Sequence, residues 1–243
     1  MIPWDRSKGT PEPISALNRV RELECGEPLV DLRVVAPSLK IMRETTIPFA
    51  RETVALMAER AASSLPDGLV LGVSDAWRPF ERQQRIYEFM MRSAKEAFPG
   101  RNHVALRRTV CKWVAPTDQK APPGHCTGAA LDVYLLDRTG ELVDVTSPYG
   151  RFRAARTYSL GLTDEAYKNR MILVEAMLGA GFSNCRDEWW HYSYGDAGWA
   201  VRTGRDACIY GLVTLDPELY QAQEALAAEA LARRPNPFLN PDA

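Results

Sequence analysis

Residues 124–136 read Gly-His-Cys-Thr-Gly-Ala-Ala-Leu-Asp-Val-Tyr-Leu-Leu, and this stretch is the starting point for the fold. From Ala129 to Leu136 the side chains are small or apolar except at Asp132, which is typical of a buried strand. A bare carboxylate in the interior costs on the order of several kcal/mol, so Asp132 needs a metal, a cation or several hydrogen-bond donors. His125 precedes the strand in a loop opened by Pro122, Pro123 and Gly124, which can aim the imidazole back toward Asp132.

A second segment, Glu188-Trp-Trp-His191, adds another imidazole and another carboxylate. A catalytic zinc ion commonly takes three protein ligands and keeps a fourth position for water, so one carboxylate remains as a general base. The aromatic run predicts a strand, in which residues three apart point to opposite faces. We therefore expect a bend or bulge near Asp187 and Glu188, with His191 on the strand as a ligand and Glu188 at its entrance.

The order of these motifs carries a family resemblance. His125-x6-Asp132 followed by Glu188-Trp-Trp-His191, with Asp75-Ala-Trp-Arg78-Pro upstream, resembles the zinc D-alanyl-D-alanine dipeptidases of the VanX type, in the peptidase M15 group. The resemblance spans residues 29 to 195. It implies an α+β single domain with a central, mostly antiparallel sheet flanked by helices and one zinc ion at the sheet.

The resemblance also implies a role for each residue of the predicted site. The metal ligands would be His125, Asp132 and His191, the catalytic base would be Glu188, and Arg78 would stabilise the transition state. The implied reaction is hydrolysis of D-alanyl-D-alanine or a similar small dipeptide by metal-activated water.

One departure from the family pattern concerns the substrate. These dipeptidases usually carry a Gly-Thr-Pro-Phe-Asp-like segment whose acid helps hold the substrate ammonium group, whereas residues 146–150 here read Thr-Ser-Pro-Tyr-Gly. Gly150 stands in place of the acid, so ammonium recognition would fall to another group such as Asp144, or the preferred dipeptide differs. Its stereochemistry stays open as well.

Several alternatives remain at this stage. The chain could be a zinc carboxypeptidase acting on peptidoglycan stem peptides. If Glu188 were a fourth ligand, the site would be closed and the protein a zinc-stabilised binding module without catalysis. Arg78 could be a structural arginine paired with Asp75 or Glu81. Cys126 and Cys185 are rival zinc ligands near the two motifs.

Composition restricts the class of protein. At 243 residues with 46% hydrophobic content, the chain can form one domain with a sizeable core. A net charge of −1 argues against nucleic acid as a partner. The first 15 residues lack an apolar signal core, no run of 18 apolar residues occurs, and the five scattered cysteines contain no C-x-x-C pair. We therefore expect a cytoplasmic protein with reduced thiols and no membrane association; homo-oligomerisation stays open.

Periodicity places these motifs on a scaffold. We expect a helix over residues 54–65, a strand over 69–73, a loop over 74–79 that carries Arg78, and a helix over 81–97. Residues 99–123 show no clear period and could form a flap or lid over the site. Asp137–Gly140 should join two apolar runs as a hairpin, and a helix capped by Thr163 should carry Tyr167, Met171, Val174 and Leu178.

The predicted division of the chain has three parts. Residues 1–28 form an extension packed on the domain, residues 29–215 form the zinc peptidase domain, and residues 216–243 form a C-terminal helix and tail.

Overall fold

A computed structural model describes residues 2–239, so the first residue of the predicted extension and the last four of the predicted tail lie outside it. The helices are α1 (Ile14–Leu17), α2 (Leu32–Val35), α3 (Glu52–Ser63), α4 (Phe80–Ala97), α5 (His103–Val110), α6 (Asp164–Gly179), α7 (Ala197–Arg202) and α8 (Gln221–Ala232), with 3-10 turns η1 (Gly124–Thr127) and η2 (Pro217–Leu219). The strands are β1 (Arg21–Glu22), β2 (Leu29–Asp31), β3 (Lys40–Ile41), β4 (Phe49–Arg51), β5 (Leu69–Asp75), β6 (Ala130–Asp137), β7 (Ser183–Asn184), β8 (His191–Ser193) and β9 (Ala207–Cys208).

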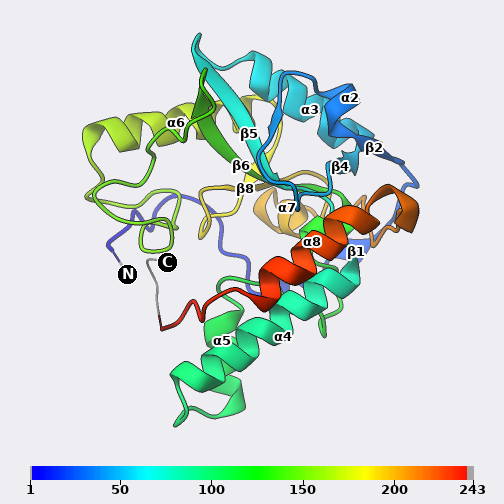
Figure 1. The fold of residues 1–243 in the computed structure, drawn as a ribbon, viewed down its shortest axis with the longest axis vertical. Coiled ribbons are helices and arrows are strands. Elements are labelled where there is room, and N and C mark those ends of the chain that lie inside the picture. The colour runs from blue at the N-terminus through cyan, green and yellow to red at the C-terminus, as the bar shows by residue number, and fades with distance from the viewer. Residues whose placement is uncertain (1, 240–243) are drawn as a thin grey trace.

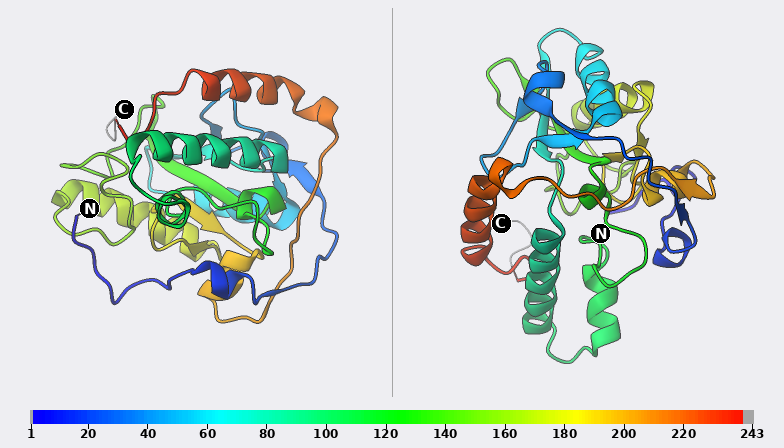
Figure 2. Two further views of the ribbon diagram at one scale, coloured as in Figure 1. Left: turned by 90° about the horizontal axis from the view of Figure 1, so that it is seen from below. Right: turned by 90° about the vertical axis from the view of Figure 1, so that its right-hand side faces the viewer.

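A five-stranded sheet in the order β3-β5-β6-β8-β7 forms the centre of the molecule. Only the β3–β5 pair is parallel, and the other neighbours are antiparallel, which confirms the predicted mostly antiparallel sheet. Helices α3 and α6 pack together beside it, while α4, α5 and α8 lie on the other side of the sheet (Figure 1). Figure 2 shows α8 running alongside α4.

Alternation along β6 separates the core from the site. Leu131, Val133 and Leu135 are almost fully buried and join the core cluster that includes the inward face of α3. Successive strand side chains point to opposite faces, so Asp132 faces away from Leu131 and Val133. The predicted strand around residue 132 is therefore present, and its geometry turns Asp132 toward α4 and α8.

The segment 99–123, which shows no clear period in the sequence, contains a helix. Residues 103–110 form α5, whose first turn is capped by Asn102 accepting a hydrogen bond from the Ala105 N–H at 3.0 Å. Leu106 and Val110 are buried with Met90 of α4. A helix of two turns with one buried i, i+4 pair gives too weak a periodicity to stand out in the sequence.

The helix after Thr163 buries only part of the apolar set that the sequence places on it, with Val174 3% exposed. Thr163 caps α6 as expected, accepting a hydrogen bond from the Ala166 N–H at 3.1 Å. Tyr167 and Leu178, however, are 40% and 42% exposed, while Arg170 is fully buried. The buried face of α6 is centred on Arg170 because its guanidinium binds carbonyl groups of the neighbouring loop.

The two ends of the chain pack on the central part. β1 pairs with β9, and Trp4 forms a bridge with Ser159. At the other end, Glu224 of α8 forms an ion pair with Arg82 of α4 at 2.7 Å. The three-part division stays a prediction. Within residues 2–239, no helix combines the length and apolar character that crossing a membrane requires.

Candidate active site

Three predicted ligands converge at one end of the central strands. Asp132 of β6 and His191 of β8 are directly paired in the antiparallel register, so their side chains share a face of the sheet. His191 Nδ1 lies 3.0 Å from Asp132 Oδ1, and His125 Nε2 lies 3.3 Å from the same oxygen. His125 Nδ1 lies 2.8 Å from the Ala76 carbonyl, to which it can donate, leaving Nε2 directed at the cluster.

The donor set suits a tetrahedral zinc ion. The ligand atoms of the three residues lie within 4.8 Å of one another, and they form the one such group found in the described part of the chain. Ligands about 2.0–2.2 Å from a tetrahedral ion are separated by roughly 3.3 Å. The observed separations of 3.0 and 3.3 Å from Asp132 are close to that value. Cys126, Cys185 and Glu188 lie outside this group.

Electrostatics keeps Asp132 ionised. Burial opposes its ionisation, but the two imidazoles outweigh burial and hold the pKa of Asp132 well below its usual range. Burial likewise lowers the pKa of His125, and the Asp132 charge more than reverses this, so the net shift is upward. The cluster is thus arranged around a buried negative charge that attracts a cation.

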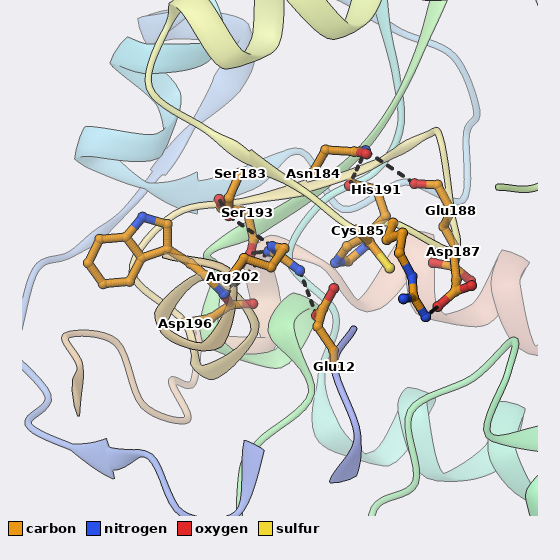
Figure 3. Close-up of polar contacts among 12 residues, drawn as sticks. Glu12, Ser183, Asn184, Cys185, Asp187, Glu188, His191, Ser193, Asp196 and Arg202 are labelled. Carbon is orange, nitrogen blue, oxygen red and sulfur yellow. Dashed lines mark hydrogen bonds and ion pairs between the residues drawn. The ribbon is translucent and has the colours of Figure 1, made fainter. Parts of the chain in front are cut away.

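Glu188 lies in a turn just before β8, as the predicted bend requires. The His191 N–H donates to the Glu188 carbonyl at 3.2 Å, and the Asn184 side-chain amide donates to the carbonyls of Glu188 and His191 at 3.3 and 3.1 Å (Figure 3). Burial raises the pKa of Glu188 to about 7. The turn brings this carboxyl to the same cavity as His191, although the two residues are three positions apart.

Arg78 lies in the loop after β5, where the sequence places it. Its guanidinium forms an ion pair with Asp75 and donates to the Gln83 side-chain oxygen, so the structural pairing with Asp75 is present. The buried Nε has no hydrogen-bond partner among the described residues. The Arg78 N–H donates to the His125 carbonyl at 3.1 Å, which ties the arginine loop to the ligand turn η1. Arg78 therefore keeps one free N–H while its orientation is held by two side chains.

A cavity of about 980 Å³ contains this site. His125, Asp132, His191, Glu188 and Arg78 all line it. Part of the 111–123 segment forms one wall and α8 forms another, while a lid function for this segment stays a prediction. Asp144 is not among the described lining residues; it accepts hydrogen bonds from the N–H groups of residues 146 and 147 in its own turn.

Two supports of the site were missed from the sequence. One is Asn184, described above, whose side-chain oxygen also accepts a hydrogen bond from the Thr157 hydroxyl at 2.6 Å. The other is Arg202, which pairs with Glu12 at 2.6 Å and donates to the hydroxyls of Ser183 and Ser193 on β7 and β8 (Figure 3). Neither had a local signal, because the partners are brought together only by folding.

Two curated proteins are similar to this chain in sequence. The D-alanyl-D-alanine dipeptidase of Escherichia coli K12 is 23% identical over 180 residues, covering 68% of this chain and 83% of that protein. A D-alanyl-D-alanine dipeptidase of Synechocystis is 30% identical over 149 residues, covering 53% of this chain and 60% of that protein.

Two solved structures show a weaker likeness. The D,D-pentapeptidase VanY from a VanB-type vancomycin resistance cassette, in complex with Zn(II), aligns with a TM-score of 0.38 and 17% identity over 84% of this chain and 94% of that chain. The LD-carboxypeptidase LdcB aligns with a TM-score of 0.39 and 13% identity over 83% and 79%.

The family model described as D-ala-D-ala dipeptidase, Peptidase_M15, matches residues 41–207. This span contains the whole ligand cluster together with Arg78 and Glu188. The chain therefore belongs to the M15 peptidase family and is a peptidase.

Proposed function

We propose that this peptidase is a zinc-dependent dipeptidase that hydrolyses D-alanyl-D-alanine or a similar small dipeptide. The observation that carries the proposal is the convergence of His125, Asp132 and His191, with Glu188 and Arg78 on the walls of the same cavity. The two curated relatives are both named for that dipeptide. The three-ligand set supports one zinc ion per chain and an open coordination position.

When bound, a zinc ion would supply Lewis-acid polarisation of the scissile carbonyl and lower the pKa of a water molecule. Glu188 accepts the proton of the attacking water and delivers it to the leaving amine. Arg78 donates its free Nε–H toward the developing oxyanion, while Asp75 and Gln83 hold the guanidinium in place. Each residue thus contributes from a position that the fold has already set.

The test is a substrate panel with matched variants. The zinc-loaded protein is offered D,D-, L,L- and mixed dipeptides, longer peptides and N-blocked peptides, and released amino acids are quantified. We expect cleavage of free dipeptides only. Glu188→Gln should retain zinc and lose about 10²- to 10⁴-fold in kcat, whereas His191→Ala should lose both zinc and activity. Parental turnover by Glu188→Gln would remove the proposed base.

The panel also decides between the remaining alternatives. Preference for longer or blocked peptides would indicate a carboxypeptidase acting on peptidoglycan stem peptides. The non-catalytic zinc module is not retained, because membership of the family makes the chain a peptidase.

A further inference from the structure

The cavity is positively charged although the whole chain carries a net charge of −1. Among the described residues that line it, cationic side chains outnumber carboxylates. Several of the cations are neutralised within the protein, such as Arg78 by Asp75 and Arg202 by Glu12. The excess positive charge must therefore be sought in lining arginines that lack such a partner.

Three of these arginines are Arg43, Arg151 and Arg234. All three line the cavity, and within residues 2–239 none has an ion pair or a side-chain hydrogen bond. They come from three separate places in the chain: the turn after β3, the loop after β6, and the end of α8. We call them the arginine triad.

Arg151 is the half-buried member, and aromatic rings hold it in place. Its guanidinium carbon lies 4.1 Å from the ring centre of Trp190, 5.2 Å from that of Tyr134 and 5.4 Å from that of Phe152. Cation–π contacts orient the flat face of a guanidinium while leaving its N–H edge available. The Nε atom of Arg151 is buried and without a hydrogen-bond partner among the described residues.

Arg43 and Arg234 are exposed at the rim of the same cavity. Partial burial, followed by the positive charges of Arg151 and Arg43, lowers the pKa of Arg234. Arg151 packs on Trp190, two residues from Glu188, and both Arg151 and Glu188 line the cavity, so this member of the triad lies near the proposed base. Three unpartnered like charges at one site are stabilised by an anion that enters with the ligand.

We propose that the arginine triad selects dipeptides that carry a carboxylate side chain. The inference rests on the proposed function and names its substrate class: an acidic dipeptide. One guanidinium can bind one carboxylate through two parallel N–H···O bonds, so the terminal carboxylate common to all dipeptides requires one arginine and not three. A cavity of about 980 Å³ also has room for a side chain longer than a methyl group.

The experiment compares acidic dipeptides with their amide counterparts. Ala-Glu and Ala-Gln, and Glu-Ala and Gln-Ala, are supplied in the configuration that the enzyme cleaves, and kcat/KM is measured for each. We expect at least one acidic dipeptide to be preferred over its amide by about tenfold, or about 1.4 kcal/mol. Arg151→Gln should bring that ratio close to one, because the rate on the acidic dipeptide falls by more than the rate on the amide.

Two further proteins keep the test independent of folding defects. The double variant Arg43→Gln/Arg234→Gln alters only exposed members of the triad and should also reduce the ratio. Arg138→Gln, an exposed arginine in the 137–140 turn away from the cavity lining, is the matched control and should leave the ratio unchanged.

Calorimetric titration of zinc-loaded Glu188→Gln with the same peptides measures discrimination without turnover. Tighter binding of an acidic peptide that Arg151→Gln abolishes supports the triad even if no dipeptide is cleaved, and in that case only the proposed function fails. Cleavage of acidic and amide dipeptides at equal rates by the parent protein overturns the triad and leaves the dipeptidase intact. An equal loss on both peptides in Arg151→Gln would assign the triad to the terminal carboxylate and overturn the proposal.

Discussion

Replacing Arg170 by Met should destabilise the protein more than most single substitutions. Arg170 is fully buried in α6, and burial lowers its pKa to about 10, so it remains charged at neutral pH. It donates to the carbonyls of Val145 at 2.9 Å, Arg156 at 2.8 Å and Ala154 at 3.0 Å. Methionine replaces the aliphatic part of the side chain and removes every donor.

The expected loss follows from the three carbonyl groups. The Val145 and Ala154 carbonyls would each lose their one hydrogen-bond donor within residues 2–239, which costs about 1–3 kcal/mol apiece. The Arg156 carbonyl keeps the Ser159 N–H and hydroxyl as donors and loses one hydrogen bond worth about 0.5–1.5 kcal/mol. Partial relaxation of the loop reduces the sum, so we expect a loss of about 3–5 kcal/mol. The free energy of unfolding of a whole domain is about 5–15 kcal/mol, so the expected loss is a large part of the total stability. At about 2–4 °C per kcal/mol for a domain of this size, Tm should fall by about 6–20 °C.

The loss should extend to the site. The Ala155 carbonyl accepts a hydrogen bond from the Trp189 N–H at 2.8 Å, next to Glu188, and Arg151 lies in the same loop. Loosening residues 145–157 should therefore lower kcat as well as Tm.

The assay is urea unfolding followed by far-UV circular dichroism, with calorimetry for Tm. The matched control is Lys168→Met, which makes a similar change at an exposed position of the same helix. The control should stay within about 0.5 kcal/mol of the parent. If Arg170→Met also stayed within 1 kcal/mol, the carbonyl contacts of Arg170 would not be a major source of stability.

Two other predictions concern the site. Asn184→Asp keeps the shape of the side chain but directs a carboxylate oxygen, which can only accept, at the carbonyls of Glu188 and His191. We expect kcat to fall about 10- to 100-fold while the zinc content stays unchanged. A kcat within twofold of the parent would contradict this positioning role for Asn184. Removal of zinc by a chelator should leave the protein folded, because Asp132 still contacts both imidazoles. The Tm of the zinc-free protein should be about 5–11 °C lower than that of protein kept at a free zinc concentration of about 100 times Kd. Scanning calorimetry that shows unfolding at room temperature on chelation would instead indicate a structural zinc site.

Local sequence determined much of the scaffold. The helices α3 and α4 and the strands β5 and β6 lie close to the predicted ranges, because each has a strong hydrophobic period and clear turn residues at its ends. The bend before His191 could also be predicted, since a regular strand cannot direct residues 188 and 191 to one side. The short helix α5 and the buried face of α6 could not, because a single buried pair or a buried arginine leaves no periodic signal.

The residue types of the site, two imidazoles, two carboxylates and an arginine, were determined by the sequence, since their chemistry and spacing are local properties. Their convergence was decided by the tertiary structure: Asp132 meets His191 through strand register, and His125 meets them through its bond to Ala76. The arginine triad likewise exists only after folding, because Arg43, Arg151 and Arg234 are far apart in the chain and their charges add up only where the three segments meet.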